Sequence, residues 1–127
     1  MMIQTHQKID PELCGAPTLL EEGFCRVEMH TIDRMAADAT GLVHGGFIFG
    51  LADYAAMLAV NHPNVVLGGA SVRFLKPVKT GDLAVCEARV LPSEGKKKTV
   101  TVTVSCGGKE VLSGELTCFV LDRHVLA

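Results

Sequence analysis

The chain has 127 residues, of which 48% are hydrophobic and 20% charged, a size and composition that predict one domain with a sizeable core. Its formal net charge of -2 at pH 7 provides no positive field of the kind that holds nucleic acid or an anionic membrane surface, so neither is an expected partner. The first residues lack the apolar core of a signal peptide, and Asp53 interrupts the longest apolar stretch before it could span a bilayer, which favours a cytoplasmic protein.

The N-terminal part of the chain predicts little regular structure. We expect residues 1–10 to form a flexible N-terminal tail and residues 11–127 to form a single domain. Asp10 followed by Pro11 is a helix-start signal, because it places an N-cap side chain before proline at the first helical position. Gly15 follows so soon that we expect no more than a short helical turn.

A buried apolar helix is the main expectation for the middle of the chain. Residues 19–30 alternate loosely and predict a strand, and residues 31–42 predict a loop or a single turn. Residues 46–60 are rich in Ala, Leu, Met and Phe without proline, which favours a helix. Because this segment is apolar nearly all round, the helix should be buried, and Pro63 follows its end.

The second half of the chain changes its hydrophobic period from 3.6 to 2. The clearest alternation runs from Thr99 to Cys106, with threonine or serine on one face and valine or cysteine on the other. The short connections between segments favour antiparallel neighbours. The expected strands are residues 65–76, 82–91, 99–106 and 110–121. We therefore predict an α+β fold in which a long antiparallel sheet wraps around the apolar helix.

Neither the cysteines nor the histidines predict a metal site. The five cysteines contain no C-x-x-C pair, and three of them lie in strand-like patterns where a thiol packs as a small hydrophobic group. The five histidines include no pair at the i, i+4 spacing that places two ligands on one helix face. We expect reduced thiols and no bound metal.

Asp53 is the only charged side chain between His44 and Asn61. Burying an unpaired carboxylate costs several kcal/mol or raises its pKa, so this residue requires a chemical role or a partner. Because no Lys or Arg lies within one helical turn of Asp53, a structural partner would have to come from another element. We therefore favour a functional role over a structural one.

One motif around this residue resembles a known family. Val43-His44-Gly45-Gly46, followed by six residues and then Asp53, is similar to the signature of hotdog-fold acyl-CoA thioesterases of the phenylacetate-pathway type. Residues 71–77, with Gly81-Asp82 after them, look like the strand and turn that follow the helix in that family, and the resemblance covers roughly residues 18–121. It implies a hotdog fold, with an antiparallel sheet around one long central helix and two subunits paired through their sheets.

The same residues suit the hydrolysis of an acyl-CoA thioester to a free acid and coenzyme A. The free N–H groups of Gly45 and Gly46 at the helix start can receive an oxyanion, and Asp53 would act as general base or as nucleophile. Coenzyme A enters as part of the substrate, and no other cofactor is expected. Eight helical residues separate Gly45 from Asp53, about 12 Å, so two chains must contribute to each site. The resemblance likewise implies a homodimer with two sites, and leaves open a dimer of dimers.

Two further site residues are implied by the resemblance. Ser71 falls where family members place a Ser or Thr that holds the attacking water, although a strand serine facing solvent fits equally well. Asp38 falls where many relatives donate a hydrogen bond to the thioester carbonyl from Asn or Gln, whereas an ionised Asp only accepts. This departure leaves open a water-mediated role, another substrate or a protonated Asp38. It also leaves open an alignment of the loop to the family that is shifted by one residue.

The remaining candidates are substrate-binding residues with ordinary alternatives. His44 is a candidate general base, but we favour a histidine that fixes the Gly-Gly turn by a hydrogen bond. Arg73, Lys76 and Lys79 would meet the phosphates of coenzyme A or form a solvated edge. The shape of the acyl group is not readable from these residues.

A non-catalytic function fits nearly the same sequence. Hotdog domains also serve as acyl-CoA sensors, as in the ligand-binding half of bacterial fatty-acid repressors, and residues 70–82 resemble those as well. Asp53 distinguishes the thioesterase from the sensor, because a protein that only binds acyl-CoA needs no carboxylate against the thioester. A hotdog dehydratase or hydratase is our last choice, because it requires a His and an acid in motifs that we do not find.

Overall fold

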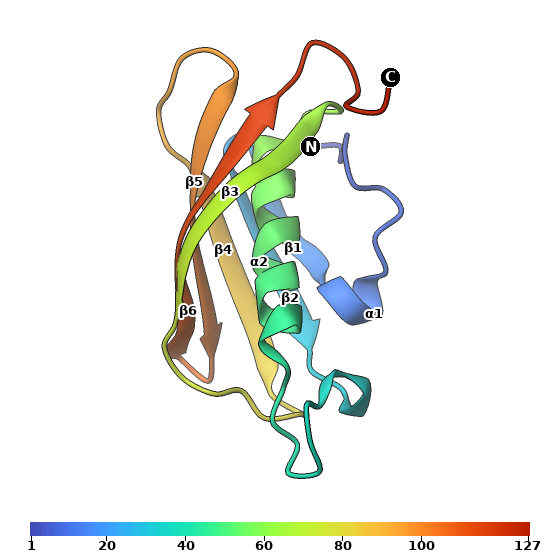
Figure 1. Ribbon diagram of the computed structural model, residues 1–127, viewed down its shortest axis with the longest axis vertical. Coiled ribbons are helices and arrows are strands. Elements are labelled where there is room, and N and C mark those ends of the chain that lie inside the picture. Colours follow the sequence, from blue (N-terminus) through green and yellow to red (C-terminus); the bar gives the residue numbers. More distant parts are fainter.

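The computed structural model describes residues 1–127 as a six-stranded antiparallel sheet wrapped around one long helix, α2 (Gly45–Val60) (Figure 1). This arrangement confirms the predicted α+β hotdog fold. The helix begins one residue before its expected start and ends where expected, at an Asn61 in the left-handed conformation. The short helix after Asp10 is also confirmed, and the Asp10 side chain accepts a hydrogen bond from the Glu12 N–H.

The sheet joins strands from both halves of the chain in the order β1-β2-β4-β5-β6-β3. The strands are β1 (Ala16–Glu21), β2 (Phe24–His30), β3 (Val65–Phe74), β4 (Leu83–Val90), β5 (Lys97–Cys106) and β6 (Lys109–Val120). Two short helices complete the set, α1 (Pro11–Cys14) and the 3-10 helix η1 (Asp33–Met35). The free edges of the sheet therefore belong to β1 and β3.

The expectation of one strand over residues 19–30 is wrong. The structure places two antiparallel strands there, with Glu21 opposite Phe24 across a tight turn. Gly23 has φ of 75° in this turn, a left-handed conformation that glycine adopts without steric cost. Apolar and polar residues alternate only weakly on both sides of Gly23, so the sequence pattern did not indicate a hairpin.

The expectation that all consecutive strands of the second half are neighbours is also wrong at one point. β4, β5 and β6 pair in sequence order, but β3 pairs with β6 on the far edge of the sheet. The segment after β3 crosses the end of the sheet, where the backbone of Lys79 bridges Leu42. Pairing β3 with β6 covers the second edge of β6, which a simple meander would leave open.

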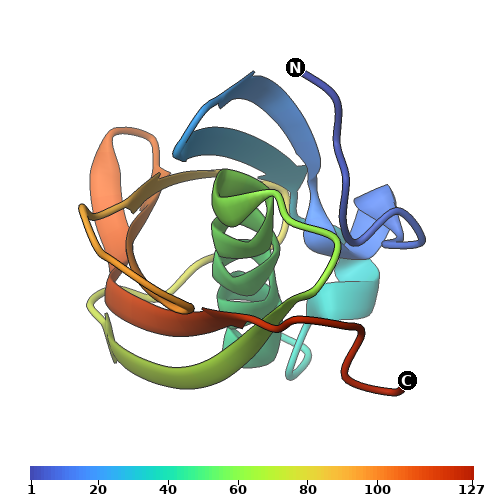
Figure 2. The same ribbon diagram turned by 90° about the horizontal axis from the view of Figure 1, so that it is seen from above.

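The core lies between the sheet and α2. Val100, Val102 and Val104 are buried, so the predicted dry face of that strand is confirmed. α2 makes most of its contacts with the sheet through β4, β2 and β5 and fewer through β3 and β6. Figure 2 shows the sheet curling around the helix, with the N-terminal residues and α1 on the side that the sheet leaves open. No helix in this structure has both the length and the apolar content needed to cross a lipid bilayer.

The first residues of the chain make specific contacts with the end of α2. Asn61 accepts a hydrogen bond from the Gln4 N–H and donates one to the Met2 carbonyl oxygen. Thr5 is 6% exposed, which is rare for a residue in a tail. The structure thus gives residues 1–10 a defined place, while their mobility stays a prediction.

Candidate active site

Asp53 lies in the middle of α2, half-buried among apolar neighbours. Its Oδ1 atom is the only buried side-chain nitrogen or oxygen in the chain that has no hydrogen-bond partner. None of the three ion pairs includes this carboxylate. A structural partner for Asp53 is therefore absent from its own chain, as the functional interpretation requires.

Burial raises the pKa of the Asp53 carboxyl above its ordinary value of 3.8, and the charge of His6 opposes this rise. A carboxylate with few polar neighbours is a stronger base than a solvated one. This environment suits a group that takes a proton from water or attacks a carbonyl carbon. His6 was missed by the sequence analysis, because it belongs to no motif.

The N-terminus of α2 is open for an oxyanion. Gly45 is the first residue of the helix, and the preceding His44 makes no side-chain capping hydrogen bond. The first N–H groups of a helix have no carbonyl partner within it, and no acidic side chain neutralises this first turn. Gly45 therefore offers the free donor that the motif predicted.

Gly45 also lines an apolar crevice of about 250 Å³. The ring of Phe74 lies so close that a Cβ atom on Gly45 would stand 3.3 Å from its Cε1. Phe74 is 57% exposed and Leu75 45% exposed, so both present apolar surface beside this crevice. The lining residues are Val43, Gly45, Ile48, Phe74, Leu75, Lys76, Pro77, Val78 and Val111. This space is compatible with the acyl or pantetheine part of a thioester.

Gly45 and Asp53 are on one straight helix and do not meet in one chain. Eight residues of helix separate them, which corresponds to about 12 Å. The residues of α2 that are not fully buried include Gly46, Phe49, Gly50 and Asp53, which share one face at helical spacing. The Gly45 N–H and the Asp53 carboxylate therefore do not form one site within a single chain.

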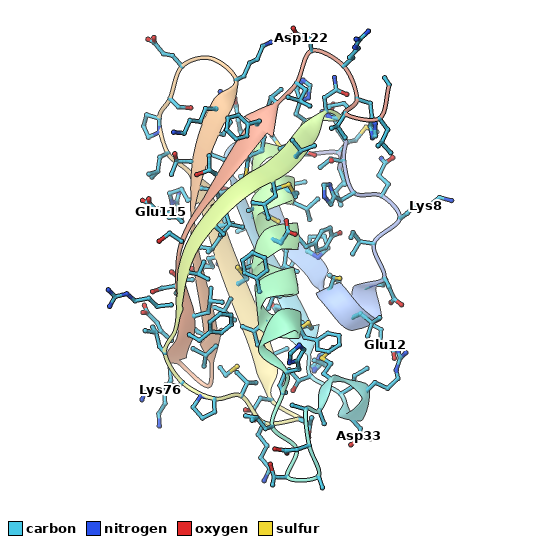
Figure 3. The ribbon with its side chains drawn as sticks, in the orientation of Figure 1. Lys8, Glu12, Asp33, Lys76, Glu115 and Asp122 are labelled. Atoms are coloured by element: carbon cyan, nitrogen blue, oxygen red, sulfur yellow. The ribbon has the colours of Figure 1, made fainter.

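The candidates on β3 lie on an open edge of the sheet. Ser71 and Arg73 are exposed and make no side-chain hydrogen bond, and Ser71 lies opposite Glu115 of β6 in the sheet. Lys76 is exposed just after the strand ends, and in Figure 3 it lies near the lower end of β3. The outer edge of β3 has no partner strand, so its backbone groups are free.

Asp38 lies at the tip of the loop before α2 and is fully exposed. Its carboxylate accepts hydrogen bonds from the Thr40 N–H at 2.9 Å and the Thr40 hydroxyl at 2.6 Å. These bonds, first of all the one from the hydroxyl, hold the pKa of Asp38 below its ordinary value. Asp38 is therefore an ionised acceptor, and the alternative of a protonated donor is disfavoured.

His44 does not fix the Gly-Gly turn through its side chain, contrary to the interpretation that we favoured. The turn is held by backbone hydrogen bonds, from the His44 N–H to the Met35 oxygen and from the Phe47 N–H to the His44 oxygen. The exposed imidazole packs against the Phe47 ring, edge to face, with centroids 6.2 Å apart. It also lies over Gly46, where a Cβ atom would stand 3.1 Å from its Cδ2. This leaves the His44 side chain free for a ligand.

Residues 40–113 match the family model described as the thioesterase superfamily. Methylthioribose-1-phosphate isomerase of Aquifex aeolicus is 55% identical over 96% of this chain, but the match covers 27% of that protein. The transcription factor FapR of Caldanaerobacter subterraneus is 31% identical over 68% of this chain and 44% of its own length. The chain thus spans less than half the length of these relatives, and their names describe much larger proteins.

Two solved structures share the fold over nearly the whole chain. The uncharacterized protein PH1136 from Pyrococcus horikoshii is 54% identical, with a TM-score of 0.98 over 100% of this chain and 98% of that one. Protein smu.793 from Streptococcus mutans UA159, solved bound to acetyl CoA, is 26% identical, with a TM-score of 0.81 over 93% and 97% of the two chains. The likeness therefore includes a protein that holds a thioester.

Asp53→Asn should make the protein more stable at neutral pH, by about 1 kcal/mol, because it removes a half-buried charge without changing the size of the side chain. The folded-state pKa of Asp53 is raised, so ionisation opposes folding fully above that pKa and not at all below the unfolded value. The difference in the free energy of unfolding between the variant and the wild type should accordingly shrink as the pH falls towards 4. Urea unfolding at several pH values measures it.

The matched control is Asp33→Asn, which changes an exposed aspartate that lies in η1, away from α2 (Figure 3). This control should leave the free energy of unfolding unchanged within about 0.5 kcal/mol. A loss of stability in Asp53→Asn at neutral pH would contradict the account, because it would reveal a stabilising partner for the carboxylate.

Proposed function

This chain belongs to the thioesterase superfamily, and from that premise we propose that it hydrolyses an acyl-CoA thioester to a free acid and coenzyme A. The observation that carries the proposal is the unpartnered, half-buried carboxylate of Asp53, on a helix whose first N–H groups are free. The acetyl CoA bound to smu.793 supports a ligand of this class. The spacing of the motif from His44 to Asp53 supports the phenylacetate-pathway type within the superfamily.

The proposed reaction uses each group for one task. The thioester carbonyl oxygen lies against the Gly45 N–H, which stabilises the negative charge of the tetrahedral intermediate. As a base, Asp53 takes a proton from water while the water oxygen bonds to the carbonyl carbon; the C–S bond then breaks, and the thiolate receives the proton. As a nucleophile, Asp53 would instead attack the carbonyl carbon and displace the coenzyme A thiolate, and water would hydrolyse the resulting anhydride to the free acid, regenerate the Asp53 carboxylate and supply the proton for the thiolate.

The distance along α2 supports a site built by two chains. Gly45 of one subunit and Asp53 of the other would face the same thioester, which gives two sites per homodimer. The open edge of β3 and the exposed apolar side chains of Phe74 and Leu75 support this edge as the pairing surface. Within such a dimer, the Ser71 hydroxyl is proposed to hold the attacking water.

The substrate's polar parts would be bound by exposed residues around the crevice. Arg73 and Lys76 suit the phosphates of coenzyme A, because both are exposed cations without an ionic partner. Gly46 and the His44 side chain lie at the N-terminus of α2, where they would contact the substrate. Asp38, ionised and exposed, would contact the thioester carbonyl oxygen only through a bridging water.

The second candidate function is non-catalytic binding of an acyl-CoA. The similarity to part of FapR favours it, because that protein is named as a transcription factor and not as a hydrolase. Against it stands the cost of keeping Asp53 half-buried without a partner, which a binder would gain nothing from. A hotdog fold by itself supports either function.

Asp53→Ala should lower kcat for thioester hydrolysis by about 100-fold or more, because the reaction loses its base or nucleophile. Release of free coenzyme A from aryl, short aliphatic and long aliphatic acyl-CoA substrates measures this and identifies the acyl class. Asp33→Asn serves as the control and should keep wild-type activity. Hydrolysis that persists in folded Asp53→Ala contradicts the assignment; saturable binding without turnover by the native protein favours the sensor.

Gly45→Pro tests the oxyanion donor at a single atom. Proline lacks the N–H but suits the first position of a helix, and His44 already has the extended backbone (ψ 129°) that a residue before proline requires. Gly45→Ala is the matched control, because it adds the same Cβ next to Phe74 and keeps the N–H. We expect kcat of the proline variant to fall about 100-fold below that of the alanine variant. Equal rates would exclude the Gly45 N–H as the donor.

A further inference from the structure

The crevice at the N-terminus of α2 has walls that hydrogen bonds hold in place. One wall is the crossing segment, residues 74–78, which runs from the end of β3 past the start of α2 (Figure 1). The Leu75 N–H donates to the Val111 oxygen at 2.7 Å, which ties this segment to β6. The Val43 N–H donates to the Val78 oxygen at 2.8 Å, which ties it to the chain before α2. The crevice is therefore preformed, so a ligand need not order its walls.

The residues that line the crevice fall into a buried floor and an exposed rim. The floor is formed by the lining residues that are at most 5% exposed, Val43, Ile48, Val78 and Val111. The rim is formed by the exposed ones, Phe74, Leu75, Lys76 and Pro77. All four floor residues belong to the close-packed core, which adapts little to a change in volume. The size of the crevice is therefore adjustable mainly at its rim.

Phe74 is the rim residue that lies against the proposed oxyanion donor. Three carbons of its ring, Cε1, Cδ1 and Cζ, lie 3.3, 3.7 and 3.8 Å from the position of a Cβ atom on Gly45. One edge of the ring therefore faces the first residue of α2. A ligand in the crevice with its carbonyl oxygen on the Gly45 N–H would pack against this ring.

The chemistry of the lining favours the acyl group over the pantetheine arm as the occupant. Pantetheine carries amide groups and a hydroxyl group, which require hydrogen-bond partners once they leave water. Lys76 is the only polar side chain in the lining, and it is exposed, so its ammonium group stays in water. An acyl chain requires no such partner and gains free energy from apolar walls.

We propose that this crevice binds the acyl group of the thioester and that Phe74 sets the length of the chain that it accepts. The inference rests on the proposed function, in which the thioester carbonyl oxygen lies against the Gly45 N–H. An apolar cavity of about 150 Å³ is large enough for benzene. At about 250 Å³, the crevice has room for an acyl group of roughly six to nine carbons, linear or aromatic, but not for a whole long fatty-acid chain.

The test compares two substitutions of Phe74 that change the volume of the crevice in opposite directions. Phe74→Ala vacates the volume of the ring and should shift the preferred substrate to longer chains. Each methylene group that the enlarged crevice newly buries should raise kcat/KM about fourfold. Phe74→Trp enlarges the ring and should shift the preference to shorter chains. The measurement is kcat/KM for a series of saturated substrates from butanoyl-CoA to hexadecanoyl-CoA.

Leu83→Ala is the matched control, because it shortens an exposed apolar side chain at the start of β4, outside the crevice. It should leave the chain-length preference unchanged. Phe74 also lies at the edge proposed for pairing, so light scattering checks the oligomeric state of each variant. The readout is the preference among chain lengths, because a loss of pairing would lower the rates for all substrates together.

Binding of S-alkyl coenzyme A thioethers, which have no thioester bond to hydrolyse, separates this inference from the proposed function. If the native protein hydrolyses no acyl-CoA but the two variants shift the chain-length dependence of Kd in opposite directions, the proposed function fails and the assignment of the crevice stands. A uniform change of kcat/KM and Kd across the series overturns the inference, because the crevice would then hold the pantetheine arm. An unchanged chain-length preference in both variants overturns it as well.

Discussion

The burial of one carboxylate on an otherwise apolar helix is the constraint on which the rest of this structure depends. A helix as apolar as α2 is stable only when a sheet covers most of its surface, and the six strands do so. The same burial removes Asp53 from bulk water without giving Oδ1 a hydrogen bond. The free energy gained by packing α2 thus offsets the cost of burying a carboxylate that has no hydrogen-bond partner in its own chain.

The hydrophobic pattern of the sequence was sufficient to predict the helix and the alternation of β5, because both depend on residues close together in the chain. It was insufficient for the hairpin at Gly23 and for the pairing of β3 with β6. The first depends on one left-handed turn within a weakly alternating segment, and the second on contacts between distant strands. Local periodicity contains no information about which strand becomes the neighbour.

The residues of the candidate site also divide into those that the sequence indicates and those that only the structure reveals. Asp53 and Gly45 were found because a charge in an apolar run and a glycine pair before a helix are visible in the sequence. His6 was not, because it belongs to no motif, although its charge lowers the pKa of Asp53 against the effect of burial. The role of Asp38 also needed the structure, since only the hydrogen bonds from Thr40 indicate its charge state. Residues that act through three-dimensional contacts have no signature in a single sequence.

The central claim is that Gly45 of one subunit and Asp53 of the other form each site, and mixed dimers test it most directly. Asp53→Asn and Gly45→Pro, each inactive alone, are unfolded together in equal amounts and refolded. If the site spans two chains, each mixed dimer regains one intact site, and random pairing restores about a quarter of the wild-type activity. Activity that stays at the level of the separate variants, although mixed dimers form, would contradict the account, because both residues would then have to act within one chain.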